Sequence, residues 1–253
     1  MTTLDSEVGT VRIFIDLETC PTTNPDTIRE IEAGVTPPGN ISKAETIAAW
    51  ERDKKPAAVA EAVNRTALDA STGGSIIAIG IATDDHEPVV LVRDPSDDSD
   101  SDAALLRSAF AHIDDILTDA APISPTDGER LFKPEPYFIG HNVSFDLGFL
   151  WRRAVITGVQ IPFDMTGPGD TRHGKNCFCT MQAWAGWGNR ISLSKLARAL
   201  HLPDPKANGI TGATAWQAWR EGNVEAVKAY CAGDVATARR IYFLMLGAQG
   251  RAA

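Results

Sequence analysis

Residues 11–17 read VRIFIDL, and the chain continues as ETCP over residues 18–21. The first stretch is short, apolar and rich in β-branched residues, which is typical of a buried strand. Asp16 and Glu18 lie at its end, separated by one residue. Because side chains two residues apart on a strand point to the same face, both carboxylates face one side of the predicted sheet. Burying two acids there is costly unless a positive group neutralises them, so this strand end is a candidate site.

Alternating strand and helix patterns along the rest of the chain indicate an α/β fold. Further strands are predicted over residues 75–83, 88–93 and 137–140. Helices are predicted over residues 103–120, 144–156, 192–200, 213–220 and 224–246. Short links between the first three strands favour antiparallel neighbours, whereas the fourth strand follows a helix and favours a parallel crossover. These elements predict one mixed sheet flanked by helices.

The chain is expected to form a single domain, residues 1–253, with a helical insertion over about 25–74 after the first strand. Within the insertion, residues 42–69 are helical in character, with Ser42 and Glu45 forming a capping box and Pro56 dividing the stretch. The run DPSDDSDSD over residues 94–102 is acidic and of low complexity, and it is interpreted as a solvated loop.

The composition excludes several classes of protein. The 253 residues are 43% hydrophobic and 23% charged, which does not fit collagen-like, disulfide-scaffold or wholly disordered chains. Its N-terminal residues do not resemble a signal peptide, and no apolar run approaches the roughly 20 residues that span a bilayer. We therefore expect a cytoplasmic protein without a membrane partner, whose four cysteines are reduced, buried thiols.

Charge is unevenly distributed along the chain. The formal net charge of −9 argues at first against a nucleic-acid partner. However, residues 84–129 hold 13 Asp or Glu against two Lys or Arg, whereas residues 172–206 hold six Lys or Arg and one acid. The local sign is the better guide, and the basic segment is either a phosphate-tracking surface or merely a solvated face.

Two further acids lie where a core-facing pattern does not require them. Asp146 opens the helix after the fourth strand, and Asp234 lies in the last helix, four residues after Tyr230. Taken singly, Asp146 could complement a helix dipole and Asp234 could pair with Tyr230. With Asp16 and Glu18 they make four carboxylates drawn from separate elements. Hard cations such as Mg²⁺ and Mn²⁺ prefer oxygen ligands, and this set is what a two-metal site needs.

Three motifs together resemble the DEDD 3′–5′ exonuclease superfamily, which has the ribonuclease H-like (DnaQ-like) fold. They are FIDLETCP over residues 14–21, IGHNVSFDLGFL over 139–150 and YCAGD over 230–234. The spacing of Tyr230 and Asp234 is similar to the DEDDy branch; the DEDDh branch has His where this chain has Ala229. Residues 192–223 are similar to predicted prokaryotic and phage exonucleases related to the exonuclease domain of family B DNA polymerases.

The resemblance implies a role for each matching residue. Asp16 would bridge two Mg²⁺ or Mn²⁺ ions, Glu18 and Asp234 would ligate the first ion, and Asp146 would hold the second. Tyr230 would orient the water that attacks phosphorus, since a phenol with a pKa of about 10 is a poor base at pH 7. The implied activity is hydrolysis from a 3′ end that releases nucleoside 5′-monophosphates.

The substrate is expected to be single-stranded DNA, with weaker predictions for the residues that contact it. Asn142 is a candidate for a hydrogen bond near the terminal nucleotide, and Leu17 and Phe145 for apolar surfaces against the last base. Lys206 is the favoured phosphate contact. Two alternatives stay open: the same chemistry on RNA or oligoribonucleotides, and an inactive module on this fold that binds nucleic acid or protein.

Overall fold

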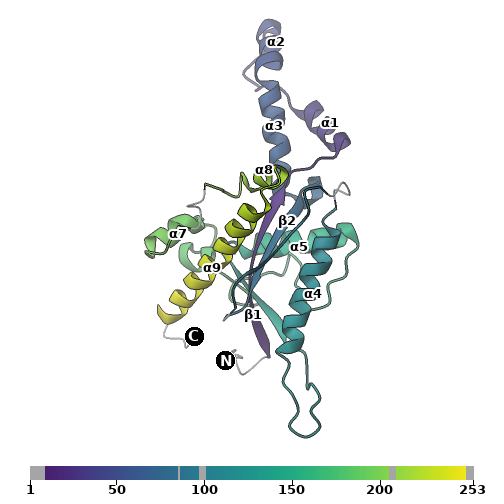
Figure 1. Cartoon of the computed structure of the whole chain (residues 1–253). Coiled ribbons are helices and arrows are strands. Elements are labelled where there is room, and N and C mark those ends of the chain that lie inside the picture. The colour runs from purple at the N-terminus through teal and green to yellow at the C-terminus, as the bar shows by residue number, and fades with distance from the viewer. Residues whose placement is uncertain (1–8, 85, 97–100, 205–208, 249–253) are drawn as a thin grey trace. The chain divides into compact units, whose positions relative to one another are not determined.

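The computed structural model describes residues 9–84, 86–96, 101–204 and 209–248 (Figure 1). The chain divides into two compact units. One comprises Met1–Glu18 and Ile76–Ala253, and the other comprises Thr19–Ser75.

A five-stranded sheet organises the described part of the chain. Its strands are β1 (Thr10–Cys20), β2 (Ser75–Ala82), β3 (Val89–Val92), β4 (Glu135–Gly140) and β5 (Cys177–Cys179), in the order β3-β2-β1-β4-β5. β1 pairs with β4 in parallel, β4 pairs with β5 in parallel, and β2 pairs with β3 antiparallel. The mixed sheet and its flanking helices confirm the predicted α/β class and are consistent with the ribonuclease H-like fold.

Helices cover both faces of this sheet (Figure 1). On one face lies the long α9 (Val224–Ala248), while α4 (Ala103–Asp119) and α5 (Val143–Thr157) lie on the other. The shorter α6 (Thr180–Ala185), α7 (Leu193–Ala199) and α8 (Ala215–Arg220) pack near α9. Alternation along β4 produces the two layers, because Ile139 packs toward α9 whereas Phe138 contacts Phe163, which in turn contacts Phe110 of α4.

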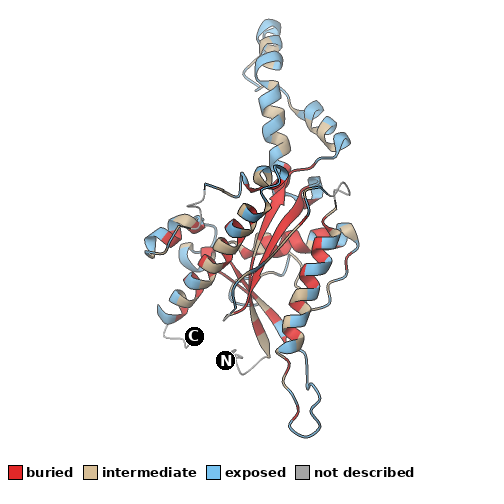
Figure 2. Ribbon diagram, viewed as in Figure 1, coloured by how far each residue is buried: buried red, intermediate tan, exposed pale blue. Residues whose placement is uncertain are grey.

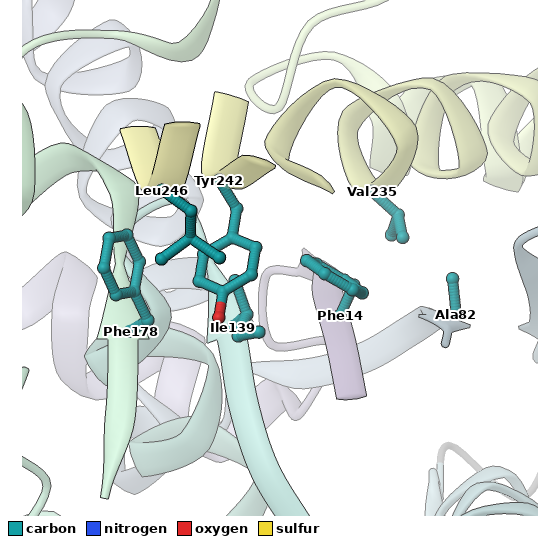
Figure 3. Packing of buried hydrophobic residues seen from close by; sticks show 7 residues of the cluster. All are labelled: Phe14, Ala82, Ile139, Phe178, Val235, Tyr242 and Leu246. Carbon is teal, nitrogen blue, oxygen red and sulfur yellow. The ribbon is translucent and has the colours of Figure 1, made fainter. Parts of the chain in front are cut away.

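The hydrophobic core between the sheet and α9 is built around aromatic side chains (Figures 2 and 3). Phe14 of β1 and Phe178 of β5 both contact the ring of Tyr242 edge-on, with centroids 5.5 and 4.9 Å apart. Val235 and Leu246 complete this side of α9. Full burial of each such side chain stabilises the fold by about 1.5–3 kcal/mol, which fixes α9 against the centre of the sheet.

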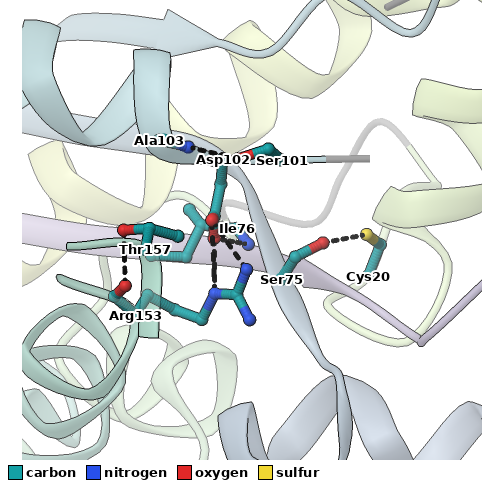
Figure 4. Close-up of polar contacts among 8 residues, drawn as sticks. All are labelled: Cys20, Ser75, Ile76, Ser101, Asp102, Ala103, Arg153 and Thr157. Atoms are coloured by element: carbon teal, nitrogen blue, oxygen red, sulfur yellow. Dashed lines mark hydrogen bonds and ion pairs between the residues drawn. The ribbon is translucent and has the colours of Figure 1, made fainter. Parts of the chain in front are cut away.

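A buried ion pair secures the opposite layer (Figure 4). Arg153 of α5 donates from Nε and Nη2 to both carboxylate oxygens of Asp102, at 2.8–3.2 Å, and Asp102 also accepts from the backbone amide of Ile76 at 2.8 Å. Asp102 is therefore fully buried at the start of α4. The expectation that the whole acidic run 94–102 is solvated is wrong at this residue, and residues 97–100 lie outside the described residues.

The second unit is helical, with α1 (Pro25–Gly34), α2 (Ala44–Asp53) and α3 (Lys55–Arg65) followed by short 3₁₀ turns. Pro56 lies in the first turn of α3, so the predicted division of this stretch is confirmed. The predicted capping box is wrong, because Lys43 is the N-cap of α2 and makes no side-chain capping bond. Within this unit, Thr66 Oγ1 accepts from the amide of Thr22 at 2.8 Å.

Some elements carry too little pattern to be predicted from the sequence. β5 and α6 are not predicted, α1 lies within the predicted helical insertion but has no predicted range of its own, and the first strand extends beyond its predicted range of residues 11–17. All four cysteines are free and buried, as expected. Among the described residues, no helix is both long and apolar enough to cross a membrane.

A close approach at Gly80 of β2 allows α9 to lie tight on the sheet. A Cβ atom at this position would lie 2.8 Å from both Cys231 Sγ and Val235 Cγ2, two fully buried side chains of α9. Gly80→Ala should therefore lower the free energy of unfolding by roughly 1–3 kcal/mol, measured by urea denaturation. Gly247→Ala is the matched control on α9, where an added Cβ meets nothing within 4 Å. It should be neutral or stabilising, and equal losses in both variants would contradict this packing.

Candidate active site

Asp16 and Glu18 lie where β1 leaves the hydrophobic core. Phe14 faces α9, so alternation along the strand carries both carboxylates to that same face. Glu18 is only 4% exposed and Asp16 is half-buried. Two carboxylates at the end of a buried strand are costly without a compensating charge, which makes this strand end unusual for a purely structural element.

Asp146 reaches the same region from α5. Because β1 and β4 run parallel, their carboxyl ends lie at one edge of the sheet, and α5 begins directly after β4. Asn142, the N-cap of α5, has a left-handed backbone with φ of 68°. Asparagine adopts this conformation more readily than most residues other than glycine, and here it turns the chain from β4 into α5. The backbone amide of Leu17 donates to Asp146 Oδ1 at 3.2 Å and so links the two strand ends.

Tyr230 and Asp234 come from α9, one helical turn apart on the face turned to the sheet. Both are buried, with 3% and 6% exposed. Between them, Cys231 places its Sγ 3.8 Å from the carbonyl oxygen of Asp16 and 3.9 Å from Asp16 Oδ2. The thiol therefore lies against the end of β1, which fixes the height at which α9 presents Tyr230 and Asp234.

Burial and mutual repulsion shift the titration of this cluster. Burial raises the pKa of Asp146 to about 8; hydrogen bonds from the backbone amides of Asp146 and Leu17 oppose the shift, and the negative charge of Asp234 adds to it. The pKa of Tyr230 is raised by burial first, then by the carboxylates of Glu18, Asp234 and Asp16. The phenol is therefore neutral at physiological pH and hydrogen-bonds to Asp234.

The donor set fits a hard divalent cation. Ligand atoms of Asp16, Glu18 and Cys231 all lie within 4.8 Å of one another. Asp146 and Asp234 line a cleft together with Asp16 and Glu18. Carboxylate oxygens are the ligands that Mg²⁺ and Mn²⁺ prefer, and a bound cation would oppose both the burial and the charge of Asp234 that raise the pKa of Asp146. Cys231 is not predicted from the sequence as a member of this group. The only signal for it in the sequence is its position directly after Tyr230.

A cleft of about 460 Å³ joins these side chains. The five residues predicted to be catalytic all line it: Asp16, Glu18, Asp146, Tyr230 and Asp234. The predicted substrate contacts Leu17, Asn142 and Phe145 line it as well. Lys206, the fourth predicted contact, lies outside the described residues.

One side of the cleft is apolar. Leu17 is buried, and the half-buried ring of Phe145 packs on Phe149 with centroids 5.5 Å apart. Met181, Ile191 and Leu193 also line the cleft but were not predicted. They lie in or beside α6 and α7, and no sequence pattern indicates that these elements reach the strand ends.

His141 ties that side of the cleft to the sheet. Its Nε2 donates to the carbonyl oxygen of Ile191 at 2.8 Å, and its Nδ1 lies 3.0 Å from Thr180 Oγ1. Both ring nitrogens are thus engaged within the protein. The ring connects the end of β4 to the segment between α6 and α7.

Comparison with known proteins identifies the part of the chain that holds α5 and α9. Neither a curated protein nor a solved structure matches the chain. A family model matches residues 129–252, which span β4, α5 and α9 and therefore include Asp146, Tyr230 and Asp234. β1, with Asp16 and Glu18, precedes this range. Residues 129–252 match the family of predicted 3′–5′ exonucleases related to the exonuclease domain of PolB.

Proposed function

We propose that this protein is a metal-dependent 3′–5′ exonuclease that removes nucleotides from single-stranded DNA and releases nucleoside 5′-monophosphates. The observation that carries the proposal is the convergence of carboxylates from β1, α5 and α9, with Tyr230, on one cleft. A module that only binds nucleic acid gains nothing from such a cluster, because four carboxylates repel phosphate unless cations are present.

Four carboxylates would hold two Mg²⁺ or Mn²⁺ ions. Asp16 would contact both ions, Glu18 and Asp234 would hold the first, and Asp146 would hold the second. When bound, two such ions supply a hydroxide near neutral pH and stabilise the charge on the departing 3′ oxygen. The amide of Leu17 keeps the Asp146 carboxylate directed at the end of β1.

Tyr230 positions the attacking water rather than deprotonating it. Its raised pKa keeps the phenol protonated across the working pH range, so the phenol oxygen can act as a hydrogen-bond partner but not as a base. The hydrogen bond to Asp234 fixes the direction of the phenol. Since attack occurs at phosphorus and the 3′ oxygen leaves, the phosphate stays on the 5′ carbon of the released nucleotide.

The apolar side of the cleft would receive the terminal nucleotide. Leu17 and Phe145 offer surfaces for the last base, and Asn142 offers an amide whose backbone turn is already set. These contacts do not distinguish deoxyribose from ribose, so the assay includes both nucleic acids. Lys206 stays a prediction for a phosphate contact.

The direct test is degradation of 5′-labelled single-stranded DNA and RNA of equal sequence, with Mg²⁺, with Mn²⁺ and with EDTA. We expect a ladder that shortens from the 3′ end only with metal, and the relative rates on DNA and RNA decide between the proposed substrate and the RNA alternative. Asp16→Ala and Asp234→Ala should each lower the rate by on the order of 100-fold or more. Glu225→Ala, an exposed acid on α9, is the control and should retain the wild-type rate. Metal-independent degradation, or a folded Asp16→Ala variant with full activity, would refute the proposal.

Metal binding should also be visible without substrate. Mn²⁺ at about 100 times its Kd should raise the free energy of unfolding of the wild type by about 2.7 kcal/mol, measured by melting with MnCl₂ and with EDTA. Asp146→Asn should reduce this gain while retaining an oxygen that can accept from Leu17. Glu225→Gln should keep the full gain, and an equal gain in Asp146→Asn would count against Asp146 as a ligand.

The same variant gives a pH-dependent result in EDTA. Because burial raises the pKa of Asp146 to about 8, its charged form is disfavoured in the folded protein. Asp146→Asn should therefore be more stable than the wild type at pH 8. The difference should shrink as the pH falls toward about 4, because the protonated wild-type carboxyl carries no charge there.

Tyr230→Phe separates positioning from metal binding. Loss of the hydroxyl should lower kcat by roughly 100-fold, because the attacking water loses its orientation, while the Mn²⁺ stabilisation stays at the wild-type value. Steady-state kinetics across about pH 6–9 should give a plot of kcat against pH with the same shape as that of the wild type. A lost ionisation in that profile would show that the phenol acts as a base.

A further inference from the structure

The loop between α6 and α7, residues 186–191, borders the cleft. It belongs to none of the elements that carry the carboxylates, which are β1, α5 and α9. Arg190 and Ile191 line the cleft directly. Gly186 and Gly188 turn the loop with φ near 80°, and hydrogen bonds hold it, including one from the amide of Asn189 to the carbonyl oxygen of Gly186 at 3.4 Å. Asn189 Nδ2 donates to the carbonyl oxygen of Ala185 at 3.1 Å, and His141 holds the carbonyl oxygen of Ile191.

Trp187 in this loop presents its indole to solvent, with 87% of the residue exposed. Trp219, by contrast, is only 6% exposed. Its Nε1 donates to the carbonyl oxygen of Arg93 at 2.7 Å, and its ring lies against the guanidinium of Arg93. Tryptophan is a large amphipathic side chain that normally contributes to stability through burial. The fold makes no such use of Trp187, although its loop is firmly held.

Arg190 supplies positive charge to the cleft. Among the described residues that line it, no lysine and no other arginine is present. Arg190 is exposed and forms no ion pair with any other residue in the described ranges. It therefore shares the cleft with four carboxylates while its donors stay available for a ligand.

An exposed aromatic ring next to an available cation is how proteins hold single-stranded nucleic acid, by stacking on a base and contacting a phosphate. Three residues span at most about 11 Å, so Trp187 and Arg190 can engage neighbouring nucleotides. In a duplex, the base next to the terminal one is covered on both faces by its neighbours, so Trp187 can stack on this base only where the strand is unpaired.

Resting on the proposed function, we propose that Trp187 and Arg190 bind the single-stranded part of the substrate just upstream of its 3′-terminal nucleotide. Arg190 contacts a phosphate beside the cleft and offsets its repulsion by the carboxylates. Trp187 stacks on the following unpaired base. The pair thereby selects a single-stranded 3′ end over a blunt duplex end.

Binding can be measured without hydrolysis by fluorescence anisotropy. The probes are 5′-fluorescein-labelled oligothymidylate and oligouridylate with hydrolysis-resistant phosphorothioate linkages, and a blunt duplex, in Mg²⁺. Trp187→Ala should weaken single-strand binding roughly 5-fold or more, Trp187→Phe should restore most of it, and duplex binding should change little. Because Trp187 is exposed, each variant should melt like the wild type.

Arg190→Ala should weaken single-strand binding and make the plot of log binding constant against log salt shallower by about 0.7. Arg198→Ala is the matched control, since it removes the same charge from the basic segment but does not line the cleft. Wild-type affinity in both Trp187→Ala and Arg190→Ala, or equal losses in Arg198→Ala and Arg190→Ala, would overturn the inference. If the wild type bound the oligonucleotides through these residues but cleaved nothing, the proposed function alone would fail.

Discussion

The parallel pairing of β1 with β4 is the constraint on which the site depends. It brings the carboxyl ends of two strands to one edge of the sheet, so that residues about 130 positions apart in the chain meet there. The hydrogen bond from the amide of Leu17 to Asp146 is the direct mark of this pairing. An antiparallel arrangement of the same strands would carry Asp16 and Asp146 to opposite edges, and no single cleft could contain both.

α9 completes the arrangement by serving two purposes along its length. Val235, Tyr242 and Leu246 bury one face against the aromatic core, and this packing fixes the helix axis. Tyr230 and Asp234 then extend the same face beyond the core to the end of β1. Because the two parts share one rigid element, packing in the core determines where the polar side chains lie. Gly80 belongs to this arrangement, since it lets the helix approach closely at Cys231.

Much of this site could be predicted from the sequence because its residues follow strong local patterns. Asp16 and Glu18 follow an apolar β-branched run, and Asp146 and Asp234 lie in the motifs IGHNVSFDLGFL and YCAGD of two predicted helices. β5 and α6 carry no such pattern, because a three-residue strand and a six-residue helix have no measurable period, and the place of Met181 of α6 in the cleft is therefore not predicted. The buried pairing of Asp102 with Arg153 was equally invisible, because nothing local distinguishes Asp102 from the acids that precede it. Such contacts depend on distances in the folded chain and leave no local trace.

The burial of all four cysteines has a practical consequence. A thiol reagent reaches a buried sulfur only when the surrounding structure opens, so the rate of labelling measures the frequency of opening. Cys20 lies in the unit of residues 19–75, whereas Cys177, Cys179 and Cys231 lie in the unit that holds the cleft. The chain therefore carries native reporters for each part, and mass spectrometry of the modified peptides would show whether the two open together or one before the other.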